Sequence, residues 1–244
     1  MATRPTAPEI SVVVPVHDEA GAAGPLAREI ADAFAGRSYE MIFVDDASRD
    51  ATLQELRALQ AELPTLRVLN HGTNAGQSRA VRTGVIAARA PVVVTLDGDG
   101  QNPPKDAPRL ADALLAAPPE VALVGGVRAS RQDTEAKRWA SRWANRIRRK
   151  LLNDDAADTG CGLKAFRRDA FLALPYFDHV HRYLPALMIR EGYRNLYLDV
   201  DHRHRATGRS KYTNWGRLVA SLSDLLGVMW LKTRSRRPGV IREY

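Results

Sequence analysis

The chain has a single cysteine and no long hydrophobic run, which argues against a disulfide-bonded protein and against a membrane-spanning one. Cys161 is the only cysteine among 244 residues, so no internal disulfide can form, which fits a reducing compartment. The first apolar run, ISVVVPV, is short and is broken by Pro15, so we expect no secretory leader. No stretch approaches the roughly 20 apolar residues that span a bilayer. We therefore expect no membrane-spanning helix, which leaves attachment at a membrane surface open.

Two common phosphate-binding motifs are also missing. None of the six lysines follows a glycine, which excludes a Walker A loop. The first predicted strand is not followed by the GxGxxG pattern of dinucleotide-binding folds. If the protein binds a nucleotide, we expect its diphosphate to be held through a metal ion rather than by a glycine-rich loop.

Acidic residues are outnumbered: 36 Lys and Arg stand against 28 Asp and Glu, giving a formal net charge of +8. Such a balance favours anionic partners, among them nucleic acid, an anionic membrane surface and phosphorylated ligands. The alternative is a compositional preference for arginine, since many basic proteins bind no polyanion. No nucleic-acid-binding fold signature accompanies the charge, so we expect no nucleic-acid partner.

What the sequence does contain is a regular alternation of short apolar runs and helical patterns. The apolar runs predict six buried strands, at Ile10–Val16, Glu40–Asp46, Leu66–His71, Pro91–Asp99, Val121–Arg128 and Asn195–His202. Helical patterns separate the first four strands, at Pro25–Gly36, Ser48–Leu63 and Asn74–Ala90. Strands this apolar are covered on both faces. The sequence therefore predicts an α/β fold with a single, mostly parallel Rossmann-like sheet flanked by helices.

Polar residues follow each of the first four predicted strands. In an open parallel sheet, ligands bind beyond the carboxyl ends of the strands. The polar segments at that edge are His17–Glu19, Asp45–Asp46, His71–Gln77 and Asp97–Gln101. Capping of the next helix explains Ser48 and Asp50 but not Asp45 and Asp46, whose carboxylates are suited to accept hydrogen bonds from a base or a ribose.

The segment DGDGQ, residues 97–101, is the strongest candidate for a metal site. Asp97 and Asp99 lie two residues apart, so in extended backbone they share a face, and their oxygens suit Mg²⁺ or Mn²⁺. An EF-hand loop is excluded because its sixth and twelfth positions hold Asn102 and Pro108. An ordinary turn rich in Asp and Gly is the alternative, and the other polar strand ends weigh against it.

Two segments have the amphipathic pattern of interfacial helices. Between Val127 and Lys150, nine basic residues stand against Asp133 and Glu135, beside a stripe that contains Trp139 and Trp143. Near the end of the chain, apolar residues repeat at helical spacing: Trp215, Leu218, Leu222, Leu225 and Met229. For both segments, packing on the body of the protein is the competing interpretation.

The motifs together resemble glycosyltransferase family 2, in its polyprenyl-phosphate branch of dolichol-phosphate mannose synthases and their undecaprenyl-phosphate relatives. The matching segments, in chain order, are VVVPVHDE, VDDASRDAT, NAGQSRAVRTG, TLDGDGQNPP, GGVRASR, DTGCGLKAFRRDAF and RATGRSKY. They run from Ile10 to about Tyr212. Asp18 replaces the usual asparagine of the first motif, and Cys161 and Lys164 also depart from the pattern.

The resemblance implies a GT-A fold, dependence on Mg²⁺ or Mn²⁺, and a division of the site residues. The metal would be held by Asp99 and Gln101. The nucleotide-sugar would contact Pro15, Val16, Glu19, Asp45, Asp46, Gln77, Asp97 and Gly98. Acceptor or donor phosphates would meet Arg128, Arg142, Arg205 and Lys211. The residues nearest the chemistry would be Asp97, Asp99, Arg128 and Asp158.

We therefore expect an inverting glycosyltransferase that moves a sugar from a nucleotide-diphosphate donor to a polyprenyl phosphate. Residues 1–212 would form the catalytic domain, and residues 213–244 an amphipathic helix and basic tail. The enzyme would lie on the cytoplasmic face of the membrane, through the lipid surface or a small membrane-protein partner. Two alternatives stay open: a family member that glycosylates a hydroxyl with Asp158 as base, and a non-enzymatic basic membrane-binding protein.

Overall fold

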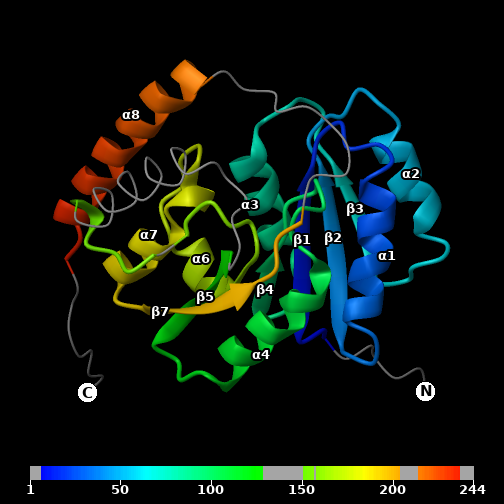
Figure 1. The fold of residues 1–244 in the computed structure, drawn as a ribbon, viewed down its shortest axis with the longest axis horizontal. Helices are drawn as coiled ribbons and strands as arrows, with labels where there is room; N and C mark the ends of the chain where they lie inside the picture. The colour runs from blue at the N-terminus through cyan, green and yellow to red at the C-terminus, as the bar shows by residue number, and fades with distance from the viewer. Residues whose placement is uncertain (1–6, 129–150, 157, 204–213, 237–244) are drawn as a thin grey trace, which may run out of the picture.

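A seven-stranded sheet forms the centre of the computed structural model, which describes residues 7–128, 151–156, 158–203 and 214–236 (Figure 1). The strands lie in the order β3-β2-β1-β4-β6-β5-β7. Their bounds are β1 Ile10–Val16, β2 Tyr39–Asp45, β3 Leu66–Asn70, β4 Val92–Thr95, β5 Val121–Arg128, β6 Lys164–Arg167 and β7 Arg194–Val200. Five of these strands come within two residues of the predicted bounds at both ends, and β4 is shorter than expected because the chain leaves the sheet at Leu96.

The sheet is parallel except at one strand. β1 pairs in parallel with β2 and β4, β2 with β3, and β5 with β7. β6 runs antiparallel to both of its neighbours, β4 and β5. The expected α/β fold with a mostly parallel sheet is therefore confirmed. The sequence did not predict β6, because KAFR has four residues with a basic residue at each end and carries no apolar run.

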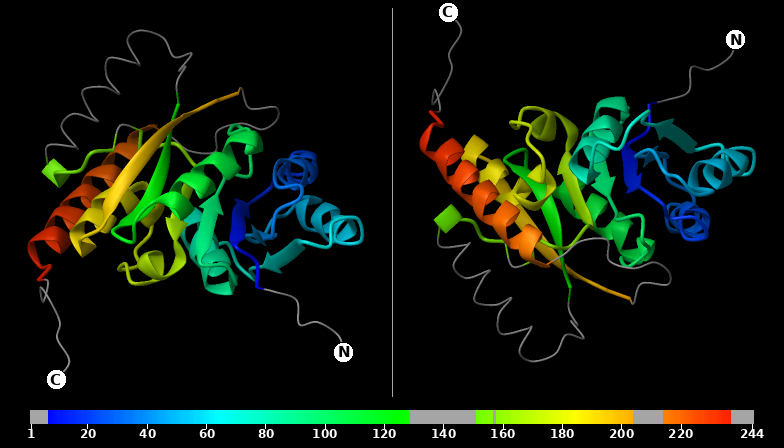
Figure 2. Two further views of the ribbon diagram at one scale, coloured as in Figure 1. Left: turned by 90° about the horizontal axis from the view of Figure 1, so that it is seen from below. Right: turned by 90° about the horizontal axis from the view of Figure 1, so that it is seen from above.

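Helices cover both faces of the sheet (Figure 2). Their bounds are α1 Ala23–Ala33, α2 Thr52–Leu59, α3 Gln77–Ala87, α4 Ala107–Ala116, α6 Arg168–Leu172, α7 Leu184–Glu191 and α8 Asn214–Thr233, with short 3-10 turns at η1 Pro104–Asp106 and η2 Val180–Arg182. One buried apolar cluster joins α1, α2 and α4 to the sheet, and the other joins α3, α6, α7 and α8 to the opposite face.

The two clusters explain why β1 is apolar at almost every position. Val12 and Val14 belong to the cluster under α1 and α4, whereas Val13 points to the cluster under α3. All seven residues of β1 are buried. A central parallel strand with helices on both sides has no wet face, so both of its side-chain sets are apolar.

The predicted C-terminal helix is present as α8, and the apolar residues predicted for it divide between a buried and an exposed side. Leu225 and Met229 do pack on the body of the protein, together with Val228, whereas Leu222 is 59% exposed. The side chain of His179 also bonds Asp224 of α8, with Nδ1 and Oδ2 2.9 Å apart. Within the described residues, no helix is both long and apolar enough to cross a bilayer. The division of the chain at residue 212 stays a prediction.

Helix α3 approaches β1 closely at Gly84. A Cβ atom at that position would lie 2.4 Å from Val13 Cγ1 and 3.2 Å from a methyl group of Val44. Both valines are buried in the sheet and have no space to move into. A glycine is therefore required here to bring α3, which begins at the ligand-binding edge, against the sheet.

We expect Gly84→Ala to lower the free energy of unfolding by about 1–3 kcal/mol, because overpacking outweighs the gain in helix propensity. Gly227→Ala is the matched control, since Gly227 also lies inside a helix but has no atom within 4 Å of the added methyl group. The control is expected to be neutral or stabilising. Urea unfolding measures the unfolding free energy of both variants. Equal effects of the two substitutions would contradict the close contact between α3 and β1 at Gly84.

Candidate active site

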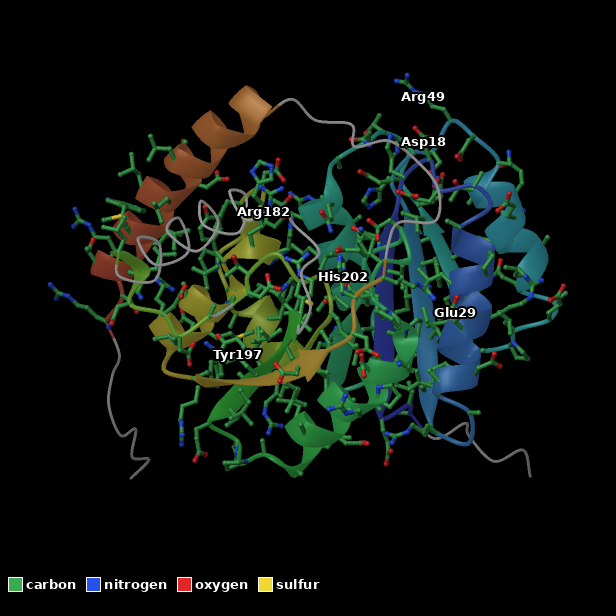
Figure 3. All side chains as sticks on the ribbon, viewed as in Figure 1. Asp18, Glu29, Arg49, Arg182, Tyr197 and His202 are labelled. Atoms are coloured by element: carbon green, nitrogen blue, oxygen red, sulfur yellow. The ribbon has the colours of Figure 1, made fainter. Side chains whose placement is uncertain are left out.

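The carboxyl ends of β1 to β4 lie at one edge of the sheet, as the polar strand ends predicted. Val16 at the end of β1 pairs with Asp45 at the end of β2, which pairs with Asn70 at the end of β3. Asp18 and Arg49 extend above this edge (Figure 3). The segments that follow these strands therefore share one region of the surface, and each is fixed by contacts with the next.

The loops after β1 and β2 are locked together by main-chain hydrogen bonds. The amide of Asp18 donates to Ser48 Oγ at 2.9 Å, and the amide of Arg49 donates back to Asp18 Oδ1 at 2.7 Å. The amide of Glu19 donates to Thr52 Oγ1 at 2.9 Å. Asp18 and Ala47 adopt positive φ angles of 51° and 58°, which turn the chain sharply at both strand ends. The edge beside Pro15, Val16 and Glu19 is thus a preformed surface.

The Asp45 carboxylate is buried and occupied by the protein itself. It is 0% exposed and accepts hydrogen bonds from the Ser48 hydroxyl and from Asn70 Nδ2, the latter at 2.6 Å. These contacts hold the loop after β2 against the end of β3. The Asp45 carboxylate therefore helps to hold the shape of the sheet edge. The nucleoside contact expected from the sequence would be a second role.

Asp46 holds the segment that leads into α3. Its carboxylate, on a residue that is 3% exposed, accepts the amides of Ala75 and Gly76 at 2.8 and 2.7 Å. His71 Nδ1 lies 2.7 Å from the same carboxylate. Gln77, the first residue of α3, is thereby positioned over the end of β4. The sequence identified Asp46 as a site residue but could not show that it acts on the loop after β3.

The chain passes very close to β1 as it leaves β4. A Cβ atom on Gly98 would lie 2.7 Å from the carbonyl oxygen of Pro15. One residue earlier, the Asp97 carboxylate lies against Gly162, where a Cβ atom would lie 2.1 Å from Oδ2. Gln77 Nε2 donates to Asp97 Oδ1 at 2.8 Å. Two glycines and one amide therefore fix Asp97, and Gly162 was not recognised from the sequence.

Burial and the neighbouring Asp99 raise the pKa of Asp97 above the usual range of a carboxyl group. Lys164, the hydrogen bond from Gln77 and Arg128 oppose this shift without cancelling it. A further cation close to the two aspartates would favour the ionised form of Asp97. The electrostatics of the β4 end thus suit a bound metal ion.

Asp99 and Gln101 belong to the same loop, and both are half-buried. Asp99 Oδ1 accepts the amide of Gln101 at 3.0 Å, and the Gln101 carbonyl accepts the amide of Arg203 at 2.9 Å. The guanidinium of Arg203 also bonds the Gly100 carbonyl and reaches Glu29 of α1. The segment after β7 therefore fixes the shape of the loop that carries the predicted metal ligands.

The donor atoms at this loop fit Mg²⁺ or Mn²⁺ bound together with a phosphate ligand. Among the described residues, no cluster of three or more His, Cys, Asp or Glu side chains is arranged to hold a metal. Mg²⁺ is commonly bound through one or two carboxylates while substrate phosphates supply other ligands. Asp99 and Gln101, with Asp97 behind them, offer that kind of partial oxygen set.

Arg128 and Asp158 form a buried ion pair beside the β4 end. Arg128 Nε lies 2.7 Å from Asp158 Oδ2, and a terminal guanidinium nitrogen lies 2.8 Å from Oδ1. Burial works against the charged guanidinium, but the hydrogen bonds and charge of Asp158 raise the pKa of Arg128 overall. This two-point contact fixes the guanidinium plane. Arg128 interacts with Asp97 as well, so the structure brings together the four residues expected nearest the chemistry, Asp97, Asp99, Arg128 and Asp158. Arg142, Arg205 and Lys211 lie outside the described residues.

A small pocket with a cavity volume of about 20 Å³ lies beside Asp97, and two of its polar residues were not predicted as site residues. Lys164 enters it from β6, and His181 enters it from η2. His181 Nδ1 lies 2.7 Å from Ser78 Oγ at the start of α3. Sequence reasoning noted Lys164 only as a departure from a motif, and nothing in the local sequence placed His181 near Asp97.

Comparison with known proteins gives consistent matches. The profile of glycosyl transferase family 2 matches residues 11–174. The dodecaprenyl-phosphate galacturonate synthase of Rhizobium johnstonii is 34% identical over 237 residues, which are 95% of this chain and 69% of the relative. The undecaprenyl-phosphate 4-deoxy-4-formamido-L-arabinose transferase of Pseudomonas aeruginosa is 34% identical over 90% of this chain and 65% of the relative. The chain thus spans about two thirds of the length of these relatives.

Solved structures agree on the fold. Glucosyl-3-phosphoglycerate synthase from Mycobacterium tuberculosis, in complex with UDP, superposes with a TM-score of 0.66 at 19% identity, covering 96% of this chain and 83% of that one. A mannosyltransferase from Pyrobaculum calidifontis, in complex with GDP-Man and Mn²⁺, gives a TM-score of 0.65 at 21% identity, covering 96% and 66%. The expected GT-A fold is therefore confirmed, as is the expected resemblance to polyprenyl-phosphate sugar transferases.

His181 makes stability depend on pH. Burial, with the charge of Arg182 adding to it, lowers the pKa of His181 from 6.5 to about 3. Between these values the unfolded chain binds a proton that the folded chain does not, so stability falls as pH falls below about 6.5. We expect this histidine to contribute a loss of up to about 1.4 kcal/mol per pH unit.

Urea unfolding of the wild type and of His181→Asn between pH 7.5 and 5 measures this contribution. The difference in unfolding free energy between the two proteins should shrink or reverse below about pH 6.5, because asparagine does not titrate. Parallel pH profiles for the two proteins would contradict the burial of a neutral His181.

Proposed function

Because the chain belongs to glycosyl transferase family 2, we propose that it transfers a sugar from a nucleotide-diphosphate donor to a polyprenyl phosphate, with inversion at the anomeric carbon. The observation that carries the proposal is the β4 end, where Asp97 and Asp99 lie beside the Arg128–Asp158 pair. Both relatives named above are described as acting on polyprenyl phosphates. Their names specify different sugars, one with a carboxylate and one without, so the sugar does not follow from similarity.

The donor would lie along the carboxyl edge of the sheet, with its nucleoside over the ends of β1 to β3. Pro15, Val16 and Glu19 would contact the donor from one side, and Gln77 and Gly98 from the side nearest β4. Asp45 and Asp46 would act partly through the loops that they hold. Since each carboxylate is already hydrogen-bonded within the protein, they supply a rigid frame for the base and the ribose.

Asp99 and Gln101 would hold Mg²⁺ or Mn²⁺ against the diphosphate. When bound, the metal would neutralise the charge that develops on the leaving nucleotide. Asp97 lies two residues before Asp99, pressed against Gly162, and would lie close to the sugar. The two carboxylates would thus hold a cation against the negative charge of the donor.

Arg128 would orient the attacking phosphate of the acceptor. Its guanidinium is held in one plane by Asp158, which leaves the opposite side of the arginine for another anion. A phosphate monoester has a second pKa near ~6, so the acceptor is mostly dianionic at neutral pH and needs no general base. The occupation of Asp158 by Arg128 supports this mechanism over attack by a hydroxyl, which would need a free base.

Transfer of labelled sugar into an organic-extractable polyprenyl product tests the proposal. Asp99→Ala should lower turnover at least about 100-fold at saturating Mn²⁺, because it removes a charged metal ligand. Asp158→Asn should cost less than about 100-fold and leave the pH dependence of turnover unchanged, because it loosens Arg128 without removing a base. Full activity in Asp99→Ala would overturn the metal assignment.

If Asp158→Asn instead lowers turnover by more than about 100-fold, keeps its affinity for the donor and no longer loses activity as the pH falls, the acceptor would be a hydroxyl and Asp158 its base.

We further propose that α8 attaches the enzyme to the cytoplasmic face of the membrane. Leu222, Leu226 and Trp230 form an outward-facing stripe in which each side chain is 59% exposed. The guanidinium of Arg234 lies 5.8 Å from the centre of the Trp230 ring, and the exposed Arg236 follows two residues later. An apolar stripe with Trp beside basic residues is typical of helices that lie on anionic lipid surfaces.

Flotation with vesicles that contain an anionic phospholipid measures this attachment. Leu226→Glu should lower the bound fraction several-fold, since it places a carboxylate within the stripe. Leu115→Glu is the matched control, because Leu115 is an exposed leucine on α4, away from α8. Equal binding of both variants would contradict attachment through α8.

A further inference from the structure

Arg203, which follows β7, contacts a loop that is distant in the sequence, and the proposed mechanism gives it no role. Its main-chain amide donates to the carbonyl oxygen of Gln101 at 2.9 Å. Its guanidinium donates through Nε to the carbonyl oxygen of Gly100. A terminal nitrogen of the same guanidinium lies 2.9 Å from Oε2 of Glu29, which is on α1 (Figure 3). One residue thus joins α1 to the loop that carries the predicted metal ligands.

These contacts fix the main chain at Gln101. The carbonyls of Gly100 and Gln101, on either side of the Gln101 Cα atom, are both held by Arg203. The amide of Gln101 donates to Asp99 Oδ1 at 3.0 Å. A Cβ atom on Gly100 would lie 3.3 Å from a terminal nitrogen of Arg203, so the guanidinium lies directly against the loop. The side chains of both predicted metal ligands therefore begin from a main chain that Arg203 holds in place.

The main chain of Arg203 is attached independently of its side chain. Two residues earlier, the amide of Asp201 donates to Asp106 Oδ2 in η1 at 2.8 Å. Lys105, also in η1, lies 2.6 Å from the Asp201 carboxylate. The segment after β7 is therefore fastened to η1 even without the guanidinium. Loss of the Arg203 side chain would remove the guanidinium contacts and leave the other attachments of this segment in place.

The alternative interpretation is an exposed ion pair without consequence. The side chains of Arg203 and Glu29 are 43% and 40% exposed, and ion pairs at such positions contribute little to stability. This pair differs because the guanidinium also donates to Gly100, which lies between the two predicted metal ligands in the chain. Groups that orient metal ligands change metal affinity without touching the metal.

We propose that Arg203 is a positioning residue of the metal site, which raises the affinity for Mg²⁺ or Mn²⁺ by fixing the loop from Asp99 to Gln101. Glu29 in turn holds the Arg203 guanidinium against this loop. The effect is transmitted through the main chain, because the contacts of Arg203 are with the carbonyls of the loop. The role rests on the proposed function, since it takes Asp99 and Gln101 as the metal ligands.

Binding of Mn²⁺ in saturating UDP or GDP, whichever the wild type binds, tests this role. The electron paramagnetic resonance signal of free Mn²⁺ measures it without turnover. We expect Arg203→Ala to raise the dissociation constant for Mn²⁺ about tenfold, the lower end of the usual effect of losing a group that orients a metal ligand. Glu29→Ala should raise it about two- to threefold, because an exposed pair is lost while Arg203 keeps its contact with Gly100.

Turnover gives a second measurement. The KM for Mn²⁺ of Arg203→Ala should rise by the same factor as the dissociation constant, whereas kcat at saturating Mn²⁺ should stay within about twofold of wild type, because the metal ligands remain. Arg203→Lys should lie between the wild type and Arg203→Ala, since lysine keeps the charge and lacks the planar set of donors. A residue that only stabilises the fold would not produce this division between KM and kcat.

Arg28→Ala is the matched control, because Arg28 is also an exposed arginine on α1 and pairs with Glu62, at 3.0 Å. It should leave the affinity for Mn²⁺ unchanged. The midpoint of urea unfolding should be similar for Arg28→Ala and Arg203→Ala, since each variant loses one exposed ion pair. If Arg203→Ala does not fold, Glu29→Ala provides the same test with the arginine in place.

Two results would overturn the proposal. Wild-type affinity for Mn²⁺ in Arg203→Ala would show that the residue has no role at the metal site. An equal loss of affinity in Arg28→Ala, or a much lower urea midpoint in Arg203→Ala than in Arg28→Ala, would show a general effect on the fold. Asp99→Ala separates this failure from that of the proposed function: if it keeps wild-type affinity for Mn²⁺, the metal lies elsewhere and the proposed function fails first.

Discussion

The close passage of β4 over the end of β1 is the constraint on which the rest of the site depends. Gly98 lies so near the Pro15 carbonyl that no side chain fits there, and Gly162 leaves space for the Asp97 carboxylate and nothing more. Asp97 is therefore held by the segment before β6 and by Gln77 at the start of α3. Because Asp99 and Gln101 follow directly, the position of the predicted metal ligands is set by this passage and by the Arg203 contacts beyond it.

The charges around this passage are consistent with an enzyme that brings two anions together. Arg128 and Lys164 lie within electrostatic range of Asp97, and each has a separate attachment that fixes its position. A donor diphosphate and an acceptor phosphate repel each other, so cations at fixed positions lower the cost of placing them in contact. In the proposed reaction, the fixed arginine would meet one anion, and the carboxylates of the β4 end would bind a cation for the other.

The sequence predicted those strands and helices that a run or a period of apolar residues reveals. Runs such as Ile10–Val16 are buried on both faces, so their apolar character reveals them, and the polar residues after them located the ligand edge. β6 escaped prediction because four residues with Lys164 and Arg167 at the ends carry no such signal. His181 reaches the pocket only through the packing of η2 against α3. The sequence could not show which side of α8 is buried, because two apolar stripes, one through Leu225 and Met229 and one through Leu222 and Leu226, share the same helical period.

The most direct test of the account is a crystal structure of the protein soaked with Mn²⁺ and UDP or GDP, with the metal located by its anomalous scattering. The account predicts a single strong peak at roughly 2.1–2.2 Å from an Asp99 carboxylate oxygen, bridging to the diphosphate, with the nucleoside over the ends of β1 to β3. A metal and nucleotide bound away from the end of β4, or no nucleotide at this edge, would contradict it.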